Sequence, residues 1–295
     1  MRLGIALGGG GAKGLAHIGV IEVLEEHGIR PQCVAGTSIG SIIGALYCLN
    51  GSADSLRQMA IELISSEEFK NLELDKFYTD ADNIFERFKK ELFEKFYFGT
   101  LLFRKSHSKI EVTKRLYSNL FGDKTFEDCK IAFTCNALNI QSGEEVVFRS
   151  GLLADAVQAS CAIPGIFPPF VKDNRVLVDG GVIDNVPIGP LKNVGAKIVV
   201  TVYLGNRPHF EGIPETGFRI NQRAQSFVRY YLDQNILTLS DCVIRPDVAK
   251  FHWADFSAVE ALVMMGREAA EKNIKKVKGI TSFWYRLRKT FWGQI

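Results

Sequence analysis

An α/β fold with a mostly parallel central sheet is the architecture that the sequence predicts. Short apolar runs, typical of buried strands, alternate with longer segments whose apolar residues recur at helical spacing. This strand–helix–strand–helix order favours right-handed crossovers between parallel strands. A length of 295 residues with 46% apolar residues suits one large domain with a substantial core, or two small ones.

The first two strand–helix units are the most clearly defined. Residues 2–7 form the kind of apolar run that is buried on both faces of a parallel sheet, and residues 15–24 give a helix its apolar face. Residues 31–35 predict the second strand, and residues 39–49 an apolar helix. Residues 257–260 (Ser-Ala-Val-Glu) have the spacing of a capping box at the start of the last helix. Later strands are expected at 130–138, 145–148, 176–178, 197–204 and 242–244, and later helices at 152–159, 219–239 and 258–278.

Residues 66–121 differ from the rest because they are rich in Phe, Lys and Glu and contain no clear strand. We expect a helical insertion that caps the α/β core of a domain spanning residues 1–279. One helical stripe of the insertion is apolar, with charged residues largely opposite; it consists of Phe85, Phe88, Leu92 and Phe96. Such a stripe fits ordinary core packing, and it also fits the wall of a pocket for an acyl chain.

The net charge of +3 is concentrated at the C-terminus. Seven Lys or Arg residues and no acid lie between Lys272 and Ile295, whereas acids outnumber bases in the rest of the chain. The six cysteines are scattered without a C-x-x-C pair, which favours a reducing compartment. The sequence has no convincing secretory signal and no apolar run of the roughly 18 residues that span a bilayer. A cytoplasmic location is therefore expected.

Four consecutive glycines, Gly8–Gly11, close the first predicted strand within the segment GGGGAKG. The glycines formally match a dinucleotide fingerprint, but the acid expected about 20 residues later, at the end of the second strand, is missing. A nucleotide phosphate loop does not fit either, because Lys13 precedes the last glycine, Gly14, instead of following it. What remains is a loop whose backbone N–H groups point at one anion, or a tight turn without a ligand. In an acyl-transfer enzyme that anion is the tetrahedral oxyanion.

A second glycine-rich turn, Gly36-Thr37-Ser38-Ile39-Gly40, follows the second predicted strand and opens a helix. This strand–turn–helix setting exposes a serine in a strained turn, and the two glycines remove side chains that would collide across it. Ser38 is therefore a candidate nucleophile. The alternative is that Ser38 is a plain helix N-cap.

A serine nucleophile needs a neighbouring general base. The order Ser38, Asp179, His252 would match that of the α/β-hydrolases, but here the serine follows only the second strand, and His252 lies at no clear strand end. Asp179 is better placed, because it ends a predicted strand and precedes two glycines, and the chemistry of α/β sheets gathers at this end of the strands. Partial burial would raise the pKa of its carboxyl group and let it accept the serine proton. Asp179 also fits a turn aspartate that binds its own backbone.

Three ordered motifs together resemble those of the bacterial patatin-like phospholipases: GGGGAKG at 8–14, GTSIG at 36–40 and DGG at 179–181. The resemblance covers residues 1–205 and includes further stretches at 159–164, 167–169 and 185–187. It implies a three-layer α/β/α fold and a Ser–Asp dyad without a catalytic histidine.

The resemblance also assigns roles by motif position. Ser38 would be the nucleophile, Asp179 the general base, and the backbone N–H groups of Gly9, Gly10 and Gly11 the oxyanion hole. Lys13 takes the basic position of the glycine loop, where it would orient the loop or attract a lipid phosphate.

The activity implied by the resemblance is that of a lipid acyl hydrolase of the phospholipase A, lysophospholipase or esterase type, which needs no metal and no organic cofactor. Its substrate would be a lipid or phospholipid ester. No nucleic-acid partner is expected, and a homo-oligomer is compatible with the sequence. The alternatives are an acyltransferase with the same dyad and a membrane-associated regulatory module with little turnover. A nucleotide-binding protein is a more distant alternative.

Residues 280–295 suit a lipid interface. Their large apolar residues fall on one helical face, flanked by Arg286, Arg288 and Lys289; the face consists of Ile280, Phe283, Trp284, Leu287 and Phe291. Aromatic anchors beside a basic face fit peripheral binding to an anionic membrane. The alternative is a C-terminal helix that packs on its own core or on a partner subunit.

Overall fold

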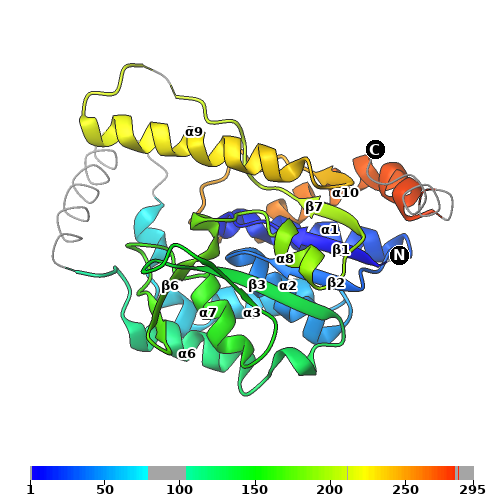
Figure 1. Ribbon diagram of the computed structural model, residues 1–295, viewed down its shortest axis with the longest axis horizontal. Helices are drawn as coiled ribbons and strands as arrows, with labels where there is room; N and C mark the ends of the chain where they lie inside the picture. The colour runs from blue at the N-terminus through cyan, green and yellow to red at the C-terminus, as the bar shows by residue number, and fades with distance from the viewer. Residues whose placement is uncertain (1, 79–103, 211, 283–284, 286–295) are drawn as a thin grey trace.

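The computed structural model describes residues 2–78, 104–210, 212–282 and 285, which form a sheet flanked by helices (Figure 1). The strands are β1 (Leu3–Leu7), β2 (Cys33–Gly36), β3 (Ala132–Asn139), β4 (Glu145–Phe148), β5 (Phe170–Lys172), β6 (Arg175–Asp179), β7 (Ile198–Val202) and β8 (Cys242–Ile244). The helices are α1 (Ala16–Glu26), α2 (Ile39–Asn50), α3 (Leu56–Ser65), α4 (Glu67–Lys70), α6 (Ile110–Phe121), α7 (Leu153–Ser160), α8 (Ile188–Asn193), α9 (Gly217–Leu237) and α10 (Val259–Thr281).

The strands form one sheet in the order β5-β6-β3-β2-β1-β7-β8, and β4 also pairs with β3. From β3 to β8 all neighbours along this order are parallel, whereas β4 and β6 run antiparallel to β3. Because only residues 140–144 connect β3 to β4, the chain is too short for a crossover there and forms a hairpin. The predicted mostly parallel sheet is confirmed.

Strands β2 and β6 share one edge of β3 and meet there end to end. Strand β2 pairs with residues 132–135 of β3, and β6 pairs with residues 137–139. Residues 135 and 137 also pair with β4, which must therefore occupy the opposite edge. The turn that leaves β2 and the turn that leaves β6 consequently face each other across a short gap beside β3.

Side chains of the central strands alternate between two cores, one on each face of the sheet. In β1, Ile5 faces the larger core, which α1, α2, α7 and α10 cover, and Ala6 faces the smaller one. The smaller core is closed by Leu191 of α8 and by Leu237 at the end of α9. Helices on both faces of a sheet buried on both sides make the three-layer α/β/α arrangement that was expected.

All seven predicted strands and all five predicted helices are present. Strand β5 was not predicted, because it has three residues and two of them are exposed.

The predicted capping box at residues 257–260 is wrong. Ala258 is the N-cap of α10, and the Ser257 hydroxyl donates to Asp255 Oδ1 at 2.6 Å instead of taking part in a helix cap. An acceptor two residues upstream competes with the cap for the same hydroxyl.

The structure describes parts of the expected insertion at 66–121 and of the C-terminal segment 280–295. Within the expected insertion, α4 and α6 are helices, and Leu72 and Leu116 join the larger core. The stripe of Phe85, Phe88, Leu92 and Phe96 lies outside the described residues, as do Phe283, Trp284, Leu287 and Phe291 of the tail. Of the tail, Ile280 belongs to α10 and is buried, and the Tyr285 hydroxyl donates to Asp241 Oδ1 at 2.6 Å. Among the described helices, none combines the length and apolarity needed to cross a bilayer.

The crossing of α1 and α10 yields a test of the packing. A Cβ on Gly266 of α10 would overlap the backbone oxygen of Ala16, so the two helices approach more closely than any other residue permits. We expect Gly266→Ala to lower the free energy of unfolding by about 1–3 kcal/mol through overpacking, measured by urea denaturation. Gly279→Ala is the matched control, because a Cβ there meets nothing within 4 Å. It should leave stability unchanged or raise it by up to ~1 kcal/mol; equal effects of the two variants would contradict the close crossing.

Candidate active site

Ser38 sits in a strained turn between β2 and α2. Its backbone has φ 54° and ψ −126°, a conformation that non-glycine residues rarely adopt and that costs about 1–3 kcal/mol. The turn is tight because a Cβ on Gly36 would overlap Gly40 O, and one on Gly40 would overlap Leu7 O. The two glycines of the predicted elbow are therefore required by the backbone itself.

Hydrogen bonds to neighbouring elements hold this strained turn in place. The Thr37 hydroxyl donates to Asn136 Oδ1 of β3 at 2.8 Å, with Asp184 O a second acceptor at 3.1 Å. The Ser38 N–H donates to Ser160 Oγ at the end of α7, at 3.0 Å. The Ser38 side chain is thereby left to point into the site instead of capping α2, whose N-cap has no side-chain hydrogen bond. The N-cap alternative for Ser38 does not apply.

Asp179 ends β6, is buried, and lies where the turn from β2 meets the turn from β6. Its Oδ1 accepts the Gly181 N–H at 2.6 Å, whereas Oδ2 is buried and has no hydrogen-bond partner of good geometry among the described residues. Burial raises the pKa of Asp179 to about 6, while Ser38, the Gly181 N–H and the Arg229 guanidinium lower it in part. The Ser38 hydroxyl is thus near enough to affect this carboxylate, although the two do not form a hydrogen bond of standard geometry in this state.

Ser38 and Asp179 line one cavity of about 400 Å³ together with Gly9, Gly10 and Gly11. The cavity wall also includes Asn185, Arg229 and Trp253. The fold therefore brings together the serine, the carboxylate and the glycine loop, three features that are far apart in the sequence.

The glycine loop approaches Ser38 so closely that it has no room for side chains. A Cβ on Gly9 would lie 2.5 Å from Asn185 Oδ1 and 3.3 Å from Ser38 Cβ. Gly11 has φ +59°, and a Cβ there would overlap Trp253 O. The Gly9 N–H already donates to Asn185 O at 3.2 Å. The N–H groups of Gly10 and Gly11 have no intramolecular acceptor in the described part of the chain, so they are the free donors of the loop.

A second, more polar cavity of about 310 Å³ adjoins the first on the far side of the glycine loop. Lys13 and Arg229 supply its cations, and Arg229 lines both cavities. Burial lowers the pKa of Lys13. Arg229, from α9, donates through Nη2 to Val182 O in the turn after Asp179, while its Nη1 is buried without a partner in the described structure. The guanidinium also lowers the pKa of the buried Asp184, although burial, the larger effect, raises that pKa to about 7.

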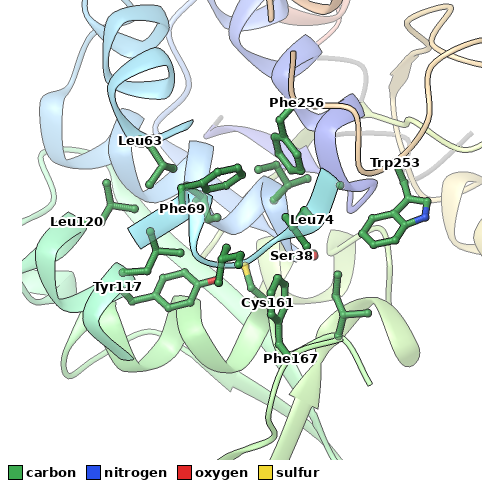
Figure 2. Close-up of a pocket in the computed structure, with 16 residues that line it drawn as sticks. Ser38, Leu63, Phe69, Leu74, Tyr117, Leu120, Cys161, Phe167, Trp253 and Phe256 are labelled. Carbon is green, nitrogen blue, oxygen red and sulfur yellow. The ribbon is translucent and has the colours of Figure 1, made fainter. Parts of the chain in front are cut away.

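A narrow apolar pocket opens on the other side of Ser38 (Figure 2) and has about 50 Å³ of open space. Helices α2, α3 and α6, the residue after α7 and the loop before α10 contribute to its wall, including Ile42, Leu63, Cys161 and Phe256. The described part of the insertion provides much of the remainder, namely Phe69, Leu72, Leu74, Leu116, Tyr117 and Leu120.

The histidines do not stand between Ser38 and Asp179, and none is among the described residues that line these three cavities. His17 is buried beneath the glycine loop, where its Nε2 bonds to Gly8 O at 2.8 Å, and burial lowers its pKa to about 4. His252 accepts the Ala254 N–H through Nδ1 at 3.2 Å, in the loop before α10. Within the described residues, no cluster of His, Cys, Asp or Glu has the form of a metal site.

Several residues of the site had not been predicted. Arg229 lies in an unremarkable helical pattern, and its partners are about 50 positions away in sequence. Trp253 contributes through its backbone oxygen, which accepts the Ala12 N–H at 2.7 Å, and no sequence pattern marks such a contact. For Asn136, in contrast, the sequence contains a signal. An amide side chain in the middle of an apolar strand needs a hydrogen-bond partner when it is buried.

Solved structures with a similar chain path include VipD from Legionella pneumophila, with a TM-score of 0.46 and 16% identity over 92% of this chain and 66% of that one. The heterodimeric ExoU–SpcU complex from Pseudomonas aeruginosa gives a TM-score of 0.45 and 18% identity over 94% of this chain and 51% of the matched one.

Sequence relatives are more informative. Lysophospholipase nte1 of Aspergillus fumigatus is 33% identical over 220 residues, which make up 73% of this chain and 13% of that protein. A patatin-like phospholipase domain-containing protein of Caenorhabditis elegans is 31% identical over 206 residues, 69% of this chain and 14% of that protein. The chain thus spans a small part of the length of these relatives. Residues 5–192, well over half of the chain, match the family model described as patatin-like phospholipase, and the chain belongs to that family.

Proposed function

We propose that this chain is a lipid acyl hydrolase with Ser38 as the nucleophile and Asp179 as the general base. The observation that carries the proposal is the pairing of a serine in a strained turn with a buried carboxylate in the same cavity. A relative named lysophospholipase and the family itself support a carboxylic ester of a lipid as the substrate.

The geometry supports a two-step reaction. Asp179 Oδ2 accepts the Ser38 proton as Oγ bonds to the ester carbonyl carbon, which forms a tetrahedral oxyanion. The oxyanion then collapses, the ester C–O bond breaks, and Asp179 returns the proton to the departing alcohol. Water next gives a proton to Asp179 and attacks the acyl carbon. The fatty acid leaves, and Ser38 Oγ regains its proton.

The oxyanion would be stabilised by backbone N–H groups of the glycine loop. Gly10 and Gly11 offer free donors, whereas the N–H of Gly9 would have to be shared with, or released from, Asn185 O. One such donor is worth about 3–4 kcal/mol of barrier in enzymes of this kind.

The apolar pocket beside Ser38 and the polar cavity that adjoins the Ser38 cavity suit the two ends of a phospholipid. The apolar pocket would receive the acyl chain, and the polar cavity with Lys13 and Arg229 would receive a phosphate-bearing head group. An open space of about 50 Å³ admits only a few groups of the size of water, at roughly 10–15 Å³ for each, and is too small for a long chain. The side chains of the insertion must therefore move apart when a long chain binds.

The first test is product analysis on a panel of phospholipids. Ser38→Ala should reduce release of fatty acid by at least about 10⁴-fold, and Asp179→Asn by about 10²–10⁴-fold. Ser41→Ala is the matched control: Ser41 lies three residues away, and its hydroxyl donates to Ser38 O at 2.6 Å without lining the cavities. The control should still react with a fluorophosphonate probe, whereas Ser38→Ala should not. Labelling of the Ser38→Ala variant would refute Ser38 as the nucleophile.

The second test is the pH dependence of kcat/KM on a soluble ester. Since Asp179 must be ionised to accept a proton and burial raises its pKa to about 6, activity should rise with pH and reach half its maximum near pH 6. An ordinary aspartate would place that midpoint near pH 4. Arg229→Gln should move the midpoint upward, because the guanidinium lowers the pKa of Asp179. A full plateau already at about pH 5 would be incompatible with a buried aspartate base.

We also propose a cytoplasmic protein that touches anionic membranes through its C-terminal residues 280–295. The basic and aromatic composition of that segment supports this contact. A chain truncated after Tyr285 keeps Ile280 in α10 and the hydrogen bond to Asp241, but loses Arg286, Arg288 and Lys289. It should bind anionic vesicles about a hundredfold more weakly, at roughly 1 kcal/mol for each of the lost cations, while hydrolysing a soluble short-chain ester normally. Equal loss on both substrates would show that the tail is structural.

A further inference from the structure

Helix α9 presents its apolar side chains to solvent. The exposed fractions of Ile220, Val228, Tyr231 and Leu232 are 55%, 52%, 58% and 45%, and Phe227 is 37% exposed. With the small Ala224 between them, these residues recur at helical spacing and form one continuous outward face, about 18 Å long. We call this set, Ile220, Ala224, Phe227, Val228, Tyr231 and Leu232, the outer face of α9. Exposed apolar patches on one element mark surfaces that bind something.

The opposite side of α9 packs on the protein mainly through polar side chains, and Leu237 at the end of the helix joins the smaller core. Asp233 is buried and accepts a hydrogen bond from the Tyr203 hydroxyl at 3.1 Å. Arg229 donates to Val182 O, and together with Ser226 and Tyr230 it lines the polar cavity next to the glycine loop. These contacts fix the rotation of the helix, so the outer face cannot turn inward without breaking them. The amphipathic pattern of an ordinary surface helix is reversed here.

Helix α9 carries a net positive charge. Between Gly217 and Leu237 the chain has three arginines and a single acid, Asp233, which is buried. Two of the arginines contact the protein, since Arg229 donates to Val182 O and Arg223 to Gly212 O. Arg219 is exposed near the start of the helix. The segment before the helix adds further exposed apolar side chains, with Phe210 at 42% and Ile213 at 92%. Apolar side chains beside arginines are the composition of helices that lie in a lipid interface.

The position of α9 relates this face to the active site and to the tail. Figure 1 shows α9 stretched along the outside of the molecule. Its inner residue Arg229 lines the cavity that holds Ser38 and Asp179. At its other end, Thr238 follows the helix and Asp241 lies three residues further on. Asp241 binds the Tyr285 hydroxyl, so Tyr285, the residue just before Arg286 in the sequence, lies at the same corner of the molecule.

We propose that the outer face of α9 is the docking surface for an anionic lipid bilayer, so that the helix whose inner residue Arg229 lines the Ser38 cavity lies on the membrane. The inference rests on the proposed function, since a lipid ester must pass from a bilayer to Ser38. A second copy of the chain is a poorer occupant, because the single acid of its α9 is buried and would not pair with Arg219. A bilayer with anionic lipids neutralises that arginine.

The test measures binding of vesicles without turnover. All chains carry Ser38→Ala, so the lipids stay intact, and all retain residues 280–295. Val228→Ser with Tyr231→Ser should weaken co-sedimentation with vesicles of phosphatidylcholine and phosphatidylglycerol at least about tenfold, because two side chains that enter the interface are lost. Arg219→Gln should weaken binding to these vesicles about fivefold and leave binding to pure phosphatidylcholine unchanged. The matched control is Ile140→Ser with Val171→Ser, two apolar residues outside α9 that are 53% and 62% exposed; it should bind like the parent.

Further measurements separate docking from catalysis and folding. With Ser38 restored, the α9 double variant should hydrolyse a soluble short-chain ester as fast as the wild type and unfold at the same temperature. The proposal would be overturned if the α9 double variant bound vesicles as well as the parent chain. It would also be overturned if the control pair, Ile140→Ser with Val171→Ser, lost as much binding as the α9 double variant. Sedimentation velocity shows whether a second copy of the chain covers α9. The proposal is also overturned if the parent chain is a dimer and the α9 double variant is a monomer that still binds vesicles. Failure of the proposed function looks different, since a wild-type chain would then sediment with vesicles but release no fatty acid.

Discussion

The buried carboxylate of Asp179 is the constraint on which the rest of the site depends. Burial raises its pKa from 3.8 to about 6, so the folded chain holds the ionised form at a disadvantage. By linkage, this group weakens folding as the pH rises from about 4 to about 6, by about 3 kcal/mol in total, and has no effect below that range. The Gly181 N–H and the Arg229 guanidinium offset part of this cost by favouring the charged form. In the proposed mechanism, the raised pKa that suits Asp179 to act as a base is thus obtained at the expense of stability.

Polar contacts that start from strand β3 and from the turn after Asp179 keep the serine next to that carboxylate. Asn136 accepts from Thr37 and donates through Nδ2 to Asp184 O at 3.0 Å, so it joins the serine turn to the turn after Asp179. Asn185 lies between the glycine loop and that same turn, within reach of a Cβ on either Gly9 or Gly181. Each of these contacts requires a backbone without a side chain at the neighbouring position. The glycines of the three motifs therefore allow the neighbouring turns to approach one another, and they also leave space for a substrate.

The sequence was sufficient for the parts of the molecule that local patterns determine. Strand and helix positions followed from periodicity, and the meeting of Ser38, Asp179 and the glycine loop followed from the rule that such loops gather at the carboxyl ends of strands. Contacts between distant segments had no local signature. The tether from Arg229 to Val182, the backbone oxygen of Trp253 and the histidine beneath the glycine loop all depend on how the chain closes in three dimensions. The capping box failed for a related reason, since Ser257 had a nearer acceptor in Asp255.

The end-to-end meeting of β2 and β6 beside β3 has a consequence for biosynthesis. Ser38, the proposed nucleophile, follows β2, whereas the proposed base Asp179 is about 140 positions further along the chain and can be seated only after β3 has added to β2. A nascent chain that ends between these two residues therefore contains the serine without the carboxylate. Under the proposed mechanism, ester hydrolysis can begin only after β6 has paired with β3.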